Sequence, residues 1–441
     1  MALLRRPQAW RLPKVVQTHL AQPQHRTAYY LTLNNFLGAA TGVLFWILLA
    51  RVAGLSPALV GVGYTVVALG TMIGVVAKGG LDTALVLKVP GTASADGRRL
   101  LTFGFAVATG VCVALTVALA AIALGFGALP ELDGFGWALV GAIAVLMVLT
   151  WLQDAYFLAL GHARLTFERN LVLTAGRLLL PVPVVLLAFA QPVPLTWGLA
   201  LVASALVGAA RSRSLPQRTG RSVPRREFLA TATRNVSSGA AEVLPGLLLA
   251  PLVLALEGPE AAAYFGIAWT AAALLFQTSG SIGRSALAQM VQAGPQGTAS
   301  AIRKAAAEHL WIVVPLALLV GLFASPLLAL FGPAYAREGS HVLVLLAAST
   351  VVVAPVSLYL AVLRSRDRTP QLVAFPAALV VCLTVAAPLL GARYGLDGIA
   401  LAWVAANTPF GLYAAWRLRR EAREVMPLVG SALVLRRADL E

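Results

Sequence analysis

Charged side chains stand inside several long apolar stretches of this 441-residue sequence. Four of them are cations: Lys78, Arg177, Arg234 and Arg284. A bare charge in hydrocarbon is costly, so each should face a polar interior. Each lies about 8–15 Å from the more basic end of its stretch at the helical rise, so together they would form a cationic funnel. Such a funnel suits a phosphate or diphosphate, although Arg177 and Arg234 are equally well explained as interfacial anchors.

Amide side chains in the same stretches are predicted to add hydrogen-bonding groups to this funnel: Asn34, Asn35, Asn235 and Gln277. Gln277 and Arg284 are separated by seven residues, with Ser281 between them, which places all three on one helical face. We predict that these polar residues line a substrate-binding cavity together with the four cations.

Three acidic residues in the apolar stretches are candidates for ion coupling: Asp82, Asp154 and Glu242. Asp82 follows Lys78 by four residues and is predicted to neutralise it. Asp154 is expected to pair with Arg177 or another cation. Glu242 precedes Pro245 by three residues, so a proton-exchanging group could sit beside a helix bend. An ion pair with a cavity arginine explains Glu242 equally well.

The composition indicates that these residues belong to a membrane protein. Hydrophobic residues make up 59% of the chain and charged residues only 12%, with a mean hydropathy of +0.81. A soluble domain has about a quarter charged residues. The net charge of +16 could suit nucleic acid, but the basic residues lie between apolar stretches, so we predict no nucleic-acid partner.

We predict an all-α polytopic fold of about twelve membrane-spanning helices in two parallel six-helix bundles around a central cavity. The first six spans are predicted at 28–50, 58–87, 100–128, 135–160, 171–190 and 194–210. The second six are predicted at 229–256, 260–290, 306–331, 341–363, 371–391 and 397–416. Most of the 34 lysines and arginines fall in the termini and in every second loop, which predicts that both termini are cytoplasmic.

The predicted organisation divides the chain at its basic connector. It comprises a basic cytoplasmic segment 1–27, a six-helix bundle 28–210, a cytoplasmic linker 211–228, a second six-helix bundle 229–416 and a cytoplasmic tail 417–441. The two bundles carry a repeated layout, because Pro57 recurs as Pro259 and Ala84 as Ala286 at the same offset.

No set of residues predicts catalysis. The sequence has no Walker loop, and its five histidines have no second ligand at metal spacing. Cys112 and Cys382 lie in distant apolar stretches, so neither a disulfide nor a metal site is expected. We therefore predict a protein that is not an enzyme and has no cofactor or metal.

Several stretches resemble the polysaccharide-biosynthesis flippases, the lipid-linked oligosaccharide branch of the multidrug/oligosaccharidyl-lipid/polysaccharide exporter superfamily. LLARVAGLSPALVGVGY at 48–64, followed by GGLDTALV, looks like the first two helices of that family. FGPAYAREGSHVLVLLAAS at 331–349 and ARYGLDGIALAW at 392–403 are similar to its turns into the tenth and twelfth helices. The resemblance covers nearly the whole chain in order.

The resemblance implies that a lipid-linked glycan is flipped from the inner to the outer leaflet of the cell membrane by alternating access. It also implies a monomer, driven by an ion gradient or the membrane potential, with membrane lipids and glycan-assembly enzymes as partners. A cation-coupled multidrug exporter of the same superfamily is the main alternative. A membrane glycan polymerase or ligase is a third reading, which the short predicted outward loops disfavour.

Overall fold

Nearly every described residue of the protein is helical. The computed structural model describes residues 23–215, 219–235, 240–366 and 368–438, and the side chains of Asn35 and Glu242 lie outside the described part. The first helices are α2 (Pro23–Ile47), the π-helical turn η1 (Leu48–Val52), α3 (Pro57–Lys78), α4 (Leu81–Lys88), α5 (Ser94–Gly125), α6 (Gly134–Ala159), α7 (Ala163–Leu179), α8 (Pro181–Leu186), α9 (Pro192–Arg213) and α10 (Arg225–Arg234). The remaining helices are α11 (Ala240–Glu308), the π-helical turn η3 (His309–Val313), α12 (Val314–Leu322), α13 (Ala324–Ala329), α14 (Pro333–Ser365) and α15 (Thr369–Ala438).

Glycines divide the two longest helices into separate spans. The backbone of α11 turns at Gly258 and Gly294, and that of α15 turns at Gly395, each with a positive φ that favours glycine. Within the described part of the chain, eight helices are long and apolar enough to cross a membrane, and two of these, Val243–Gly294 and Pro370–Arg423, contain such a turn. The prediction of an all-α membrane fold with about twelve helices is confirmed.

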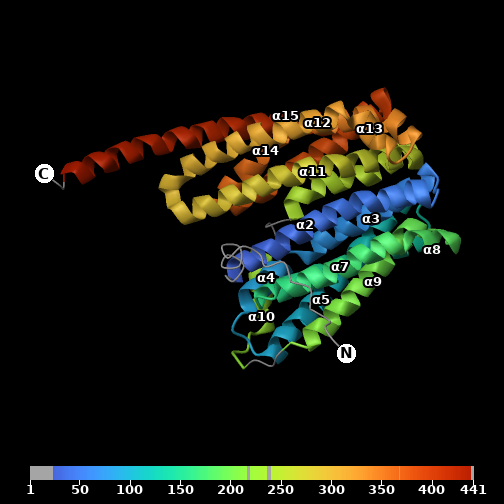
Figure 1. Cartoon of the computed structure of the whole chain (residues 1–441), viewed down its shortest axis with the longest axis horizontal. Coiled ribbons are helices and arrows are strands. Elements are labelled where there is room, and N and C mark those ends of the chain that lie inside the picture. Colours follow the sequence, from blue (N-terminus) through green and yellow to red (C-terminus); the bar gives the residue numbers. More distant parts are fainter. Residues whose placement is uncertain (1–22, 216–218, 236–239, 367, 439–441) are drawn as a thin grey trace, which may run out of the picture.

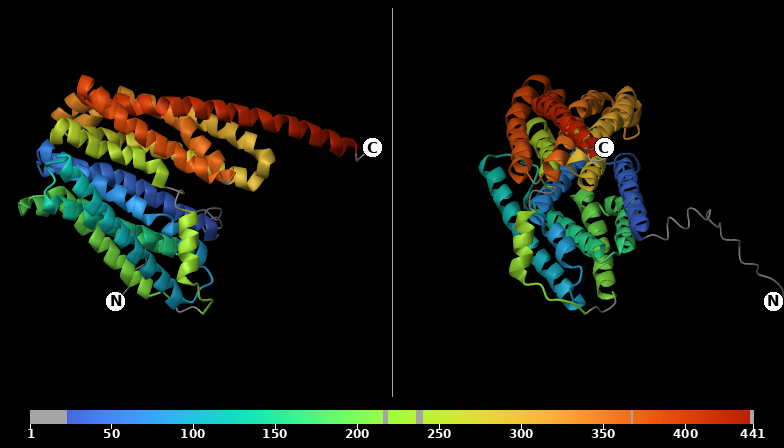
Figure 2. Two further views of the ribbon diagram at one scale, coloured as in Figure 1. Left: turned by 180° about the vertical axis from the view of Figure 1, so that it is seen from behind. Right: turned by 90° about the vertical axis from the view of Figure 1, so that its left-hand side faces the viewer.

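Two predicted spans are wrong in their extent. The span 58–87 is interrupted because Gly79 and Gly80 are both left-handed, with φ of 42° and 80°, so α3 ends at Lys78. The span 229–256 is also wrong at its start, because α10 is a separate helix that ends at Arg234. Figure 2 shows α10 crossing the direction of the neighbouring helices.

Helix α10 packs against α5 through one buried ring and is linked to the end of α4 by one ion pair. The Phe228 side chain is fully buried, with its ring centroid 6.4 Å from that of Phe103 on α5. At the exposed side, Lys88 Nζ donates to Glu227 Oε1 at 2.5 Å. This contact lowers the pKa of Glu227 below its usual value.

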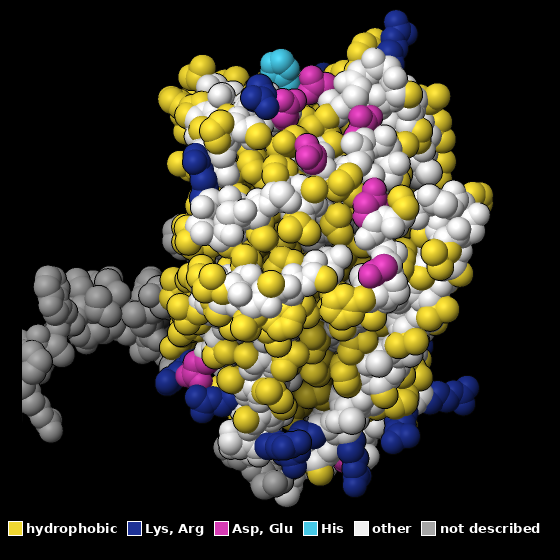
Figure 3. All heavy atoms as spheres, turned by 90° about the vertical axis from the view of Figure 1, so that its right-hand side faces the viewer, with side chains coloured by type: hydrophobic (Ala, Val, Ile, Leu, Met, Phe, Trp, Pro, Cys, Tyr) yellow, Lys and Arg dark blue, Asp and Glu magenta, His cyan; other side chains and the backbone are white. Residues whose placement is uncertain are grey.

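The helices form two groups that lie side by side, as Figure 1 shows. The first group, called the N-half here, runs from α2 to α10, and the second, the C-half, runs from α11 to α15; the last part of α15 projects beyond the others. On the face drawn in Figure 3, most of the visible lysines and arginines lie at one end, with a broad apolar band above them. We call this the basic end, and the opposite end, where Glu131, Glu257, Glu338 and Asp397 lie, the acidic end.

The two halves touch closely along α3 and the section of α11 that begins at Pro259. A side chain added at Gly61 would place its Cβ 1.8 Å from the Pro259 carbonyl oxygen. A Cβ at Gly266 would likewise lie 2.6 Å from the Tyr64 ring. Small residues are what lets helix backbones approach each other within a membrane, where apolar burial drives association weakly. The repeated helices that begin at Pro57 and Pro259 therefore form the seam between the halves.

A second link joins the halves at the acidic end. Arg51, in the π-helical turn η1, donates from Nη2 to the Ala329 carbonyl oxygen at 2.6 Å and from Nε to that of Leu330 at 3.3 Å. These carbonyls lie at the end of α13, where no intrahelical donor remains for them. A guanidinium of the N-half thus caps a helix of the C-half.

A buried ion pair holds three helices of the N-half together. Arg169 on α7 is only 2% exposed, and its Nη2 and Nε lie 2.7 and 3.1 Å from the carboxylate oxygens of Asp154 on α6. Its Nη1 also donates to the Ser204 hydroxyl of α9 at 2.8 Å. The prediction that Asp154 pairs with a cation is confirmed, and the partner is Arg169 rather than Arg177.

Replacing Gly61 with valine should force the halves apart at the seam. The side chain needs roughly 2 Å more room against the Pro259 carbonyl than the backbone allows. We expect the distance between spin labels at Val52 and Arg337, in a background with the native cysteines replaced, to be longer than in the parent protein. Double electron–electron resonance measures it. Gly198→Val is the matched control because its Cβ would meet no atom within 4 Å. An unchanged distance in the Gly61 variant would contradict the seam.

Replacing Arg169 with methionine should destabilise the protein by about 3–5 kcal/mol, because the Asp154 carboxylate is then buried without a partner. Changing Asp154 to leucine in the same chain should recover most of that loss. Thermal unfolding in detergent measures both effects, with the exposed Arg337→Ala as a control that leaves the transition unchanged. If the double variant were no more stable than the single one, the ion pair would not be the cause.

Candidate functional site

Two adjoining pockets lie at and beside the seam between the halves. The polar pocket is a cavity of about 270 Å³ that takes residues from both halves, among them Asn34, Asn170, Thr174, Arg177 and Gln277. The aromatic pocket, of about 310 Å³, lies within the C-half and takes Trp269, Phe276, Gln277, Arg284, Phe375 and Trp403, among others. Gln277 lines both pockets, so they are neighbours.

Arg177 is held in the polar pocket by an indole ring rather than by a carboxylate. Its guanidinium carbon lies 3.6 Å from the centroid of the Trp197 ring, which comes from α9. Trp197 in turn packs edge-on against Phe45 of α2, with 5.2 Å between ring centroids. The Nε of Arg177 is buried and has no hydrogen-bond partner among the described residues. Stacking therefore fixes the guanidinium plane in the wall of the polar pocket.

Arg284 provides a second cation from the other half of the molecule. Its Nη2 donates to the Ser281 hydroxyl at 2.8 Å, one turn earlier on α11. This bond confirms that Ser281 and Arg284 share a helical face. None of the ion pairs among the described residues includes Arg177 or Arg284. Each half thus contributes one arginine that forms no ion pair with a described carboxylate.

Packed rings and one indole hydrogen bond hold the wall of the aromatic pocket. The Trp269 and Trp403 rings meet edge-on with their centroids 5.0 Å apart, and Phe276 lies 5.8 Å from Trp403. The indole nitrogen of Trp403 donates to the Ser349 hydroxyl at 3.1 Å. These flat rings make an apolar surface in the same pocket as Arg284.

Neither pocket is lined by an aspartate or glutamate among the described residues. Asn34 and Gln277 make no side-chain hydrogen bond to another described residue, so their amides remain available in the polar pocket. The described lining of the polar pocket therefore combines an arginine with free amide groups. This arrangement can bind an anion or a polyhydroxyl group, and it offers no acid to attract a cation.

Lys78 and Asp82 form an ion pair outside the linings of these two pockets. Lys78 Nζ lies 2.8 Å from Asp82 Oδ2, although the Gly79–Gly80 break separates the two residues. The ammonium also lies 5.6 Å from the centroid of the Trp151 ring. The predicted pairing is confirmed, and it neutralises the Lys78 charge within its own half.

The predicted funnel of four cations is therefore wrong as a single lining. Arg234 is exposed at the end of α10, because the chain leaves the helix there instead of continuing into a span. Asn235 follows it and donates from its side chain to the Thr231 carbonyl at 2.8 Å, so it also lies outside both pockets. Of the predicted binding residues, Asn34, Arg177, Gln277 and Arg284 line the two pockets. The side chains of Asn35 and Glu242 are outside the described residues.

Sequence reasoning missed Arg169, Asn170 and Trp197. The first two precede the span predicted at 171–190, and α7 begins earlier, at Ala163. Because the first turns of α7 are polar, hydropathy assigned this stretch to a loop. Trp197 lies in a predicted span, but the sequence of an apolar helix does not indicate that its indole ring contacts Arg177.

No protein-family model matches the sequence, and no curated protein does. Solved structures do match. The fold is similar to that of a multidrug-resistance MATE family transporter of the MOP superfamily in an inward-facing conformation, with 15% identity and a TM-score of 0.68, covering 89% of this chain and 96% of that one. It is also similar to the lipid II flippase MurJ in an inward closed conformation, with 14% identity and a TM-score of 0.60, covering 89% of both chains.

A MOP superfamily transporter from Pyrococcus furiosus, described as having a binding pocket of reverse polarity, matches with 14% identity and a TM-score of 0.58, over 94% of this chain and 99% of that one. The second of these three proteins is described as a lipid II flippase, and the first and third are described as transporters of the MOP superfamily. The chain is thus a multi-pass membrane protein with the fold of that superfamily.

Proposed function

We propose that this protein is a transporter that moves an anionic lipid-linked oligosaccharide or polysaccharide precursor from the inner to the outer leaflet. The observation that carries the proposal is the pair of arginines, Arg177 and Arg284, in adjoining pockets, neither of which has a carboxylate partner among the residues that the structure describes. A phosphate or diphosphate accepts bidentate hydrogen bonds from such guanidinium groups. The aromatic pocket beside them supplies flat surfaces for sugar rings or an apolar segment.

The charge of the pockets favours this substrate over a cationic drug. A cation in a cavity of low dielectric needs a nearby acid, and the described linings contain none. The same fold accommodates both a MATE transporter and the lipid II flippase MurJ, so the fold does not choose between them. The lining residues provide the distinction, and multidrug export remains the second candidate.

Alternating access is the proposed mechanism, with the basic end in the cytoplasm. In this arrangement the halves are joined at the seam and by the Arg51 cap near the acidic end. Opening toward the outer leaflet requires both contacts to separate while the halves close at the basic end. A membrane potential that is negative inside favours outward movement of a negative charge, by about 2.3 kcal/mol per charge for each 100 mV.

We further propose that the protein works as a monomer in the cell membrane, close to glycan-assembly enzymes that supply its substrate. Its domain organisation is proposed to follow the basic connector at 211–228, with six spans on each side. We assign proton coupling to Glu242, because Asp82 and Asp154 each form an ion pair, with Lys78 and Arg169 respectively. Pro245, three residues after Glu242, lines the aromatic pocket, so a proton exchanged nearby could influence that wall.

Replacing Arg177 or Arg284 with alanine should each reduce transport by about tenfold or more, because a charge-assisted hydrogen bond contributes about 1.5–3 kcal/mol. Lysine at either position should retain part of the activity, since the charge remains and the forked donors are lost. Purified protein in liposomes, with lipid-linked saccharides on one side and a defined potential, provides the measurement. Arg337→Ala removes an exposed charge as a control. Transport of cationic drugs but not of anionic lipids would instead establish the second candidate.

Replacing Glu242 with glutamine should leave the protein folded and make transport independent of an imposed proton gradient. The amide has the shape of the carboxyl group but cannot exchange a proton near neutral pH. The same liposomes, with and without a pH difference at fixed potential, measure the effect. Equal dependence on the pH difference in both proteins would remove Glu242 from the mechanism.

A further inference from the structure

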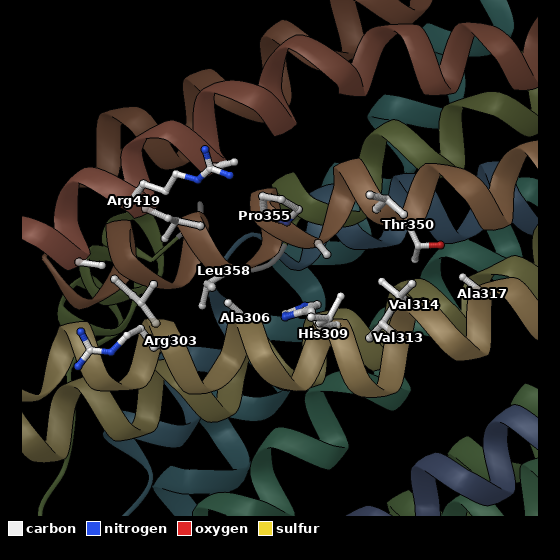
Figure 4. A pocket seen from close by; sticks show the side chains of 17 residues that line it. Arg303, Ala306, His309, Val313, Val314, Ala317, Thr350, Pro355, Leu358 and Arg419 are labelled. Carbon is white, nitrogen blue, oxygen red and sulfur yellow. The ribbon is translucent and has the colours of Figure 1, made fainter.

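The C-half has a large groove away from the two pockets of the seam. Its volume is about 540 Å³, and its walls come from three places: the end of α11 with η3 and α12, the middle of α14, and α15 near Leu418. Apolar side chains dominate the lining, and two of them, Leu310 and Val351, are 58% and 57% exposed. We infer from these exposed side chains that the groove opens on the outer surface of the helices. Figure 4 shows its lining, with the walls from α11 and α14 facing each other.

Both long walls of the groove are irregular helices. One wall contains the π-helical turn η3, which is followed by Pro315. The facing wall contains Pro355 inside α14. A proline removes a backbone donor and crowds the preceding turn, so each wall bends instead of packing flat against the other. The groove is thus built into the backbone of the C-half rather than left by one small side chain.

Two arginines lie at one end of the groove. Figure 4 shows Arg303 of α11 and Arg419 of α15 on opposite walls near that end, and the lining beyond them is apolar apart from His309 and Thr350. Neither arginine takes part in an ion pair among the described residues. The nearest acidic residue on α15, Glu421, accepts from both terminal nitrogens of Arg366 and so does not neutralise Arg419.

The length of the groove matches one leaflet. From Arg303 to Ala317 the chain advances fourteen residues, which is about 20 Å of helix. Half of the hydrocarbon core is about 15 Å, and the headgroup layer adds about 5–7 Å. The arginines belong to the basic end, so they would stand at the headgroups of one leaflet while the apolar walls reach the middle of the bilayer.

We propose that this groove binds one anionic phospholipid of the leaflet at the basic end. Its phosphate headgroup accepts hydrogen bonds from Arg303 and Arg419, and one acyl chain lies along the apolar walls. The occupant is a membrane phospholipid rather than the transported lipid, because the groove ends in the bilayer middle and its described lining shares no residue with the polar or aromatic pocket. A lipid bound in this groove would contact α11, α14 and α15 on their membrane-facing side.

A photo-crosslinking amino acid in place of Leu310 tests the groove directly, because this exposed residue lines it. The full chain is reconstituted in phosphatidylcholine vesicles that contain a minor share of phosphatidylglycerol, and the attached lipid is identified by mass spectrometry. We expect phosphatidylglycerol to be enriched over its share of the vesicle. Arg303→Gln and Arg419→Gln should each reduce that enrichment roughly fivefold, since a basic residue at an anionic surface is worth about 1 kcal/mol.

Two further variants separate the groove from general surface charge. Ala306→Phe keeps both arginines and fills the groove, so it should abolish the enrichment. Arg213→Gln with Arg226→Gln removes the same charge from exposed positions of the N-half and should leave it unchanged. Equal attachment of both lipids in the parent protein, or enrichment that survives Ala306→Phe, would overturn the proposal. So would displacement by a polyprenyl phosphate, which would make the groove part of the transport path. The assay needs no transport, so it stands or fails apart from the proposed function.

Discussion

The cost of an unneutralised charge inside hydrocarbon organises this molecule. Where two opposite charges can meet, the fold pairs them: Lys78 with Asp82 at a helix break, and Asp154 with Arg169 between α6 and α7. Arg177 and Arg284 differ from these residues: an indole ring holds Arg177, and neither arginine forms an ion pair with a described carboxylate. A protein keeps such a group only where water or a ligand can solvate it. For this reason we propose that an anionic group binds beside Arg177.

The seam gives that place a way to open and close. Gly61 and Gly266 let the backbone and rings of opposite halves touch, in a setting where packing rather than apolar burial drives helix association. Such contacts lose little when they separate, because no large apolar surface becomes newly exposed to water. Arg51, which caps α13 across the halves, adds hydrogen bonds that can be exchanged for water at the membrane surface. Two helix groups joined along one seam of small residues are suited to moving as two bodies.

The helical membrane fold could be predicted from the sequence because hydrocarbon imposes a length and a composition on every span. Local spacing also predicted contacts within one helix, such as Lys78 with Asp82 and Ser281 with Arg284. It failed where the backbone changes direction, because left-handed glycines at 79 and 80 leave no trace in hydropathy.

Contacts between distant segments were the other gap. The partner of Asp154 stands 15 positions away on a helix whose first turns are polar, and the stacking of Arg177 on Trp197 joins two helices. Periodicity places residues on a face of one helix, but it does not say which faces meet. For the same reason Arg234 was expected inside a span, whereas it ends the crossing helix α10.

A structure of the protein with a short-chain polyprenyl diphosphate saccharide tests the central claim most directly. The account predicts that the diphosphate lies between the halves, with its oxygens about 2.7–2.9 Å from the guanidinium nitrogens of Arg177, and with the saccharide or the apolar chain against the aromatic pocket. A diphosphate bound elsewhere, with Arg177 engaged by a carboxylate of the protein, would contradict the account.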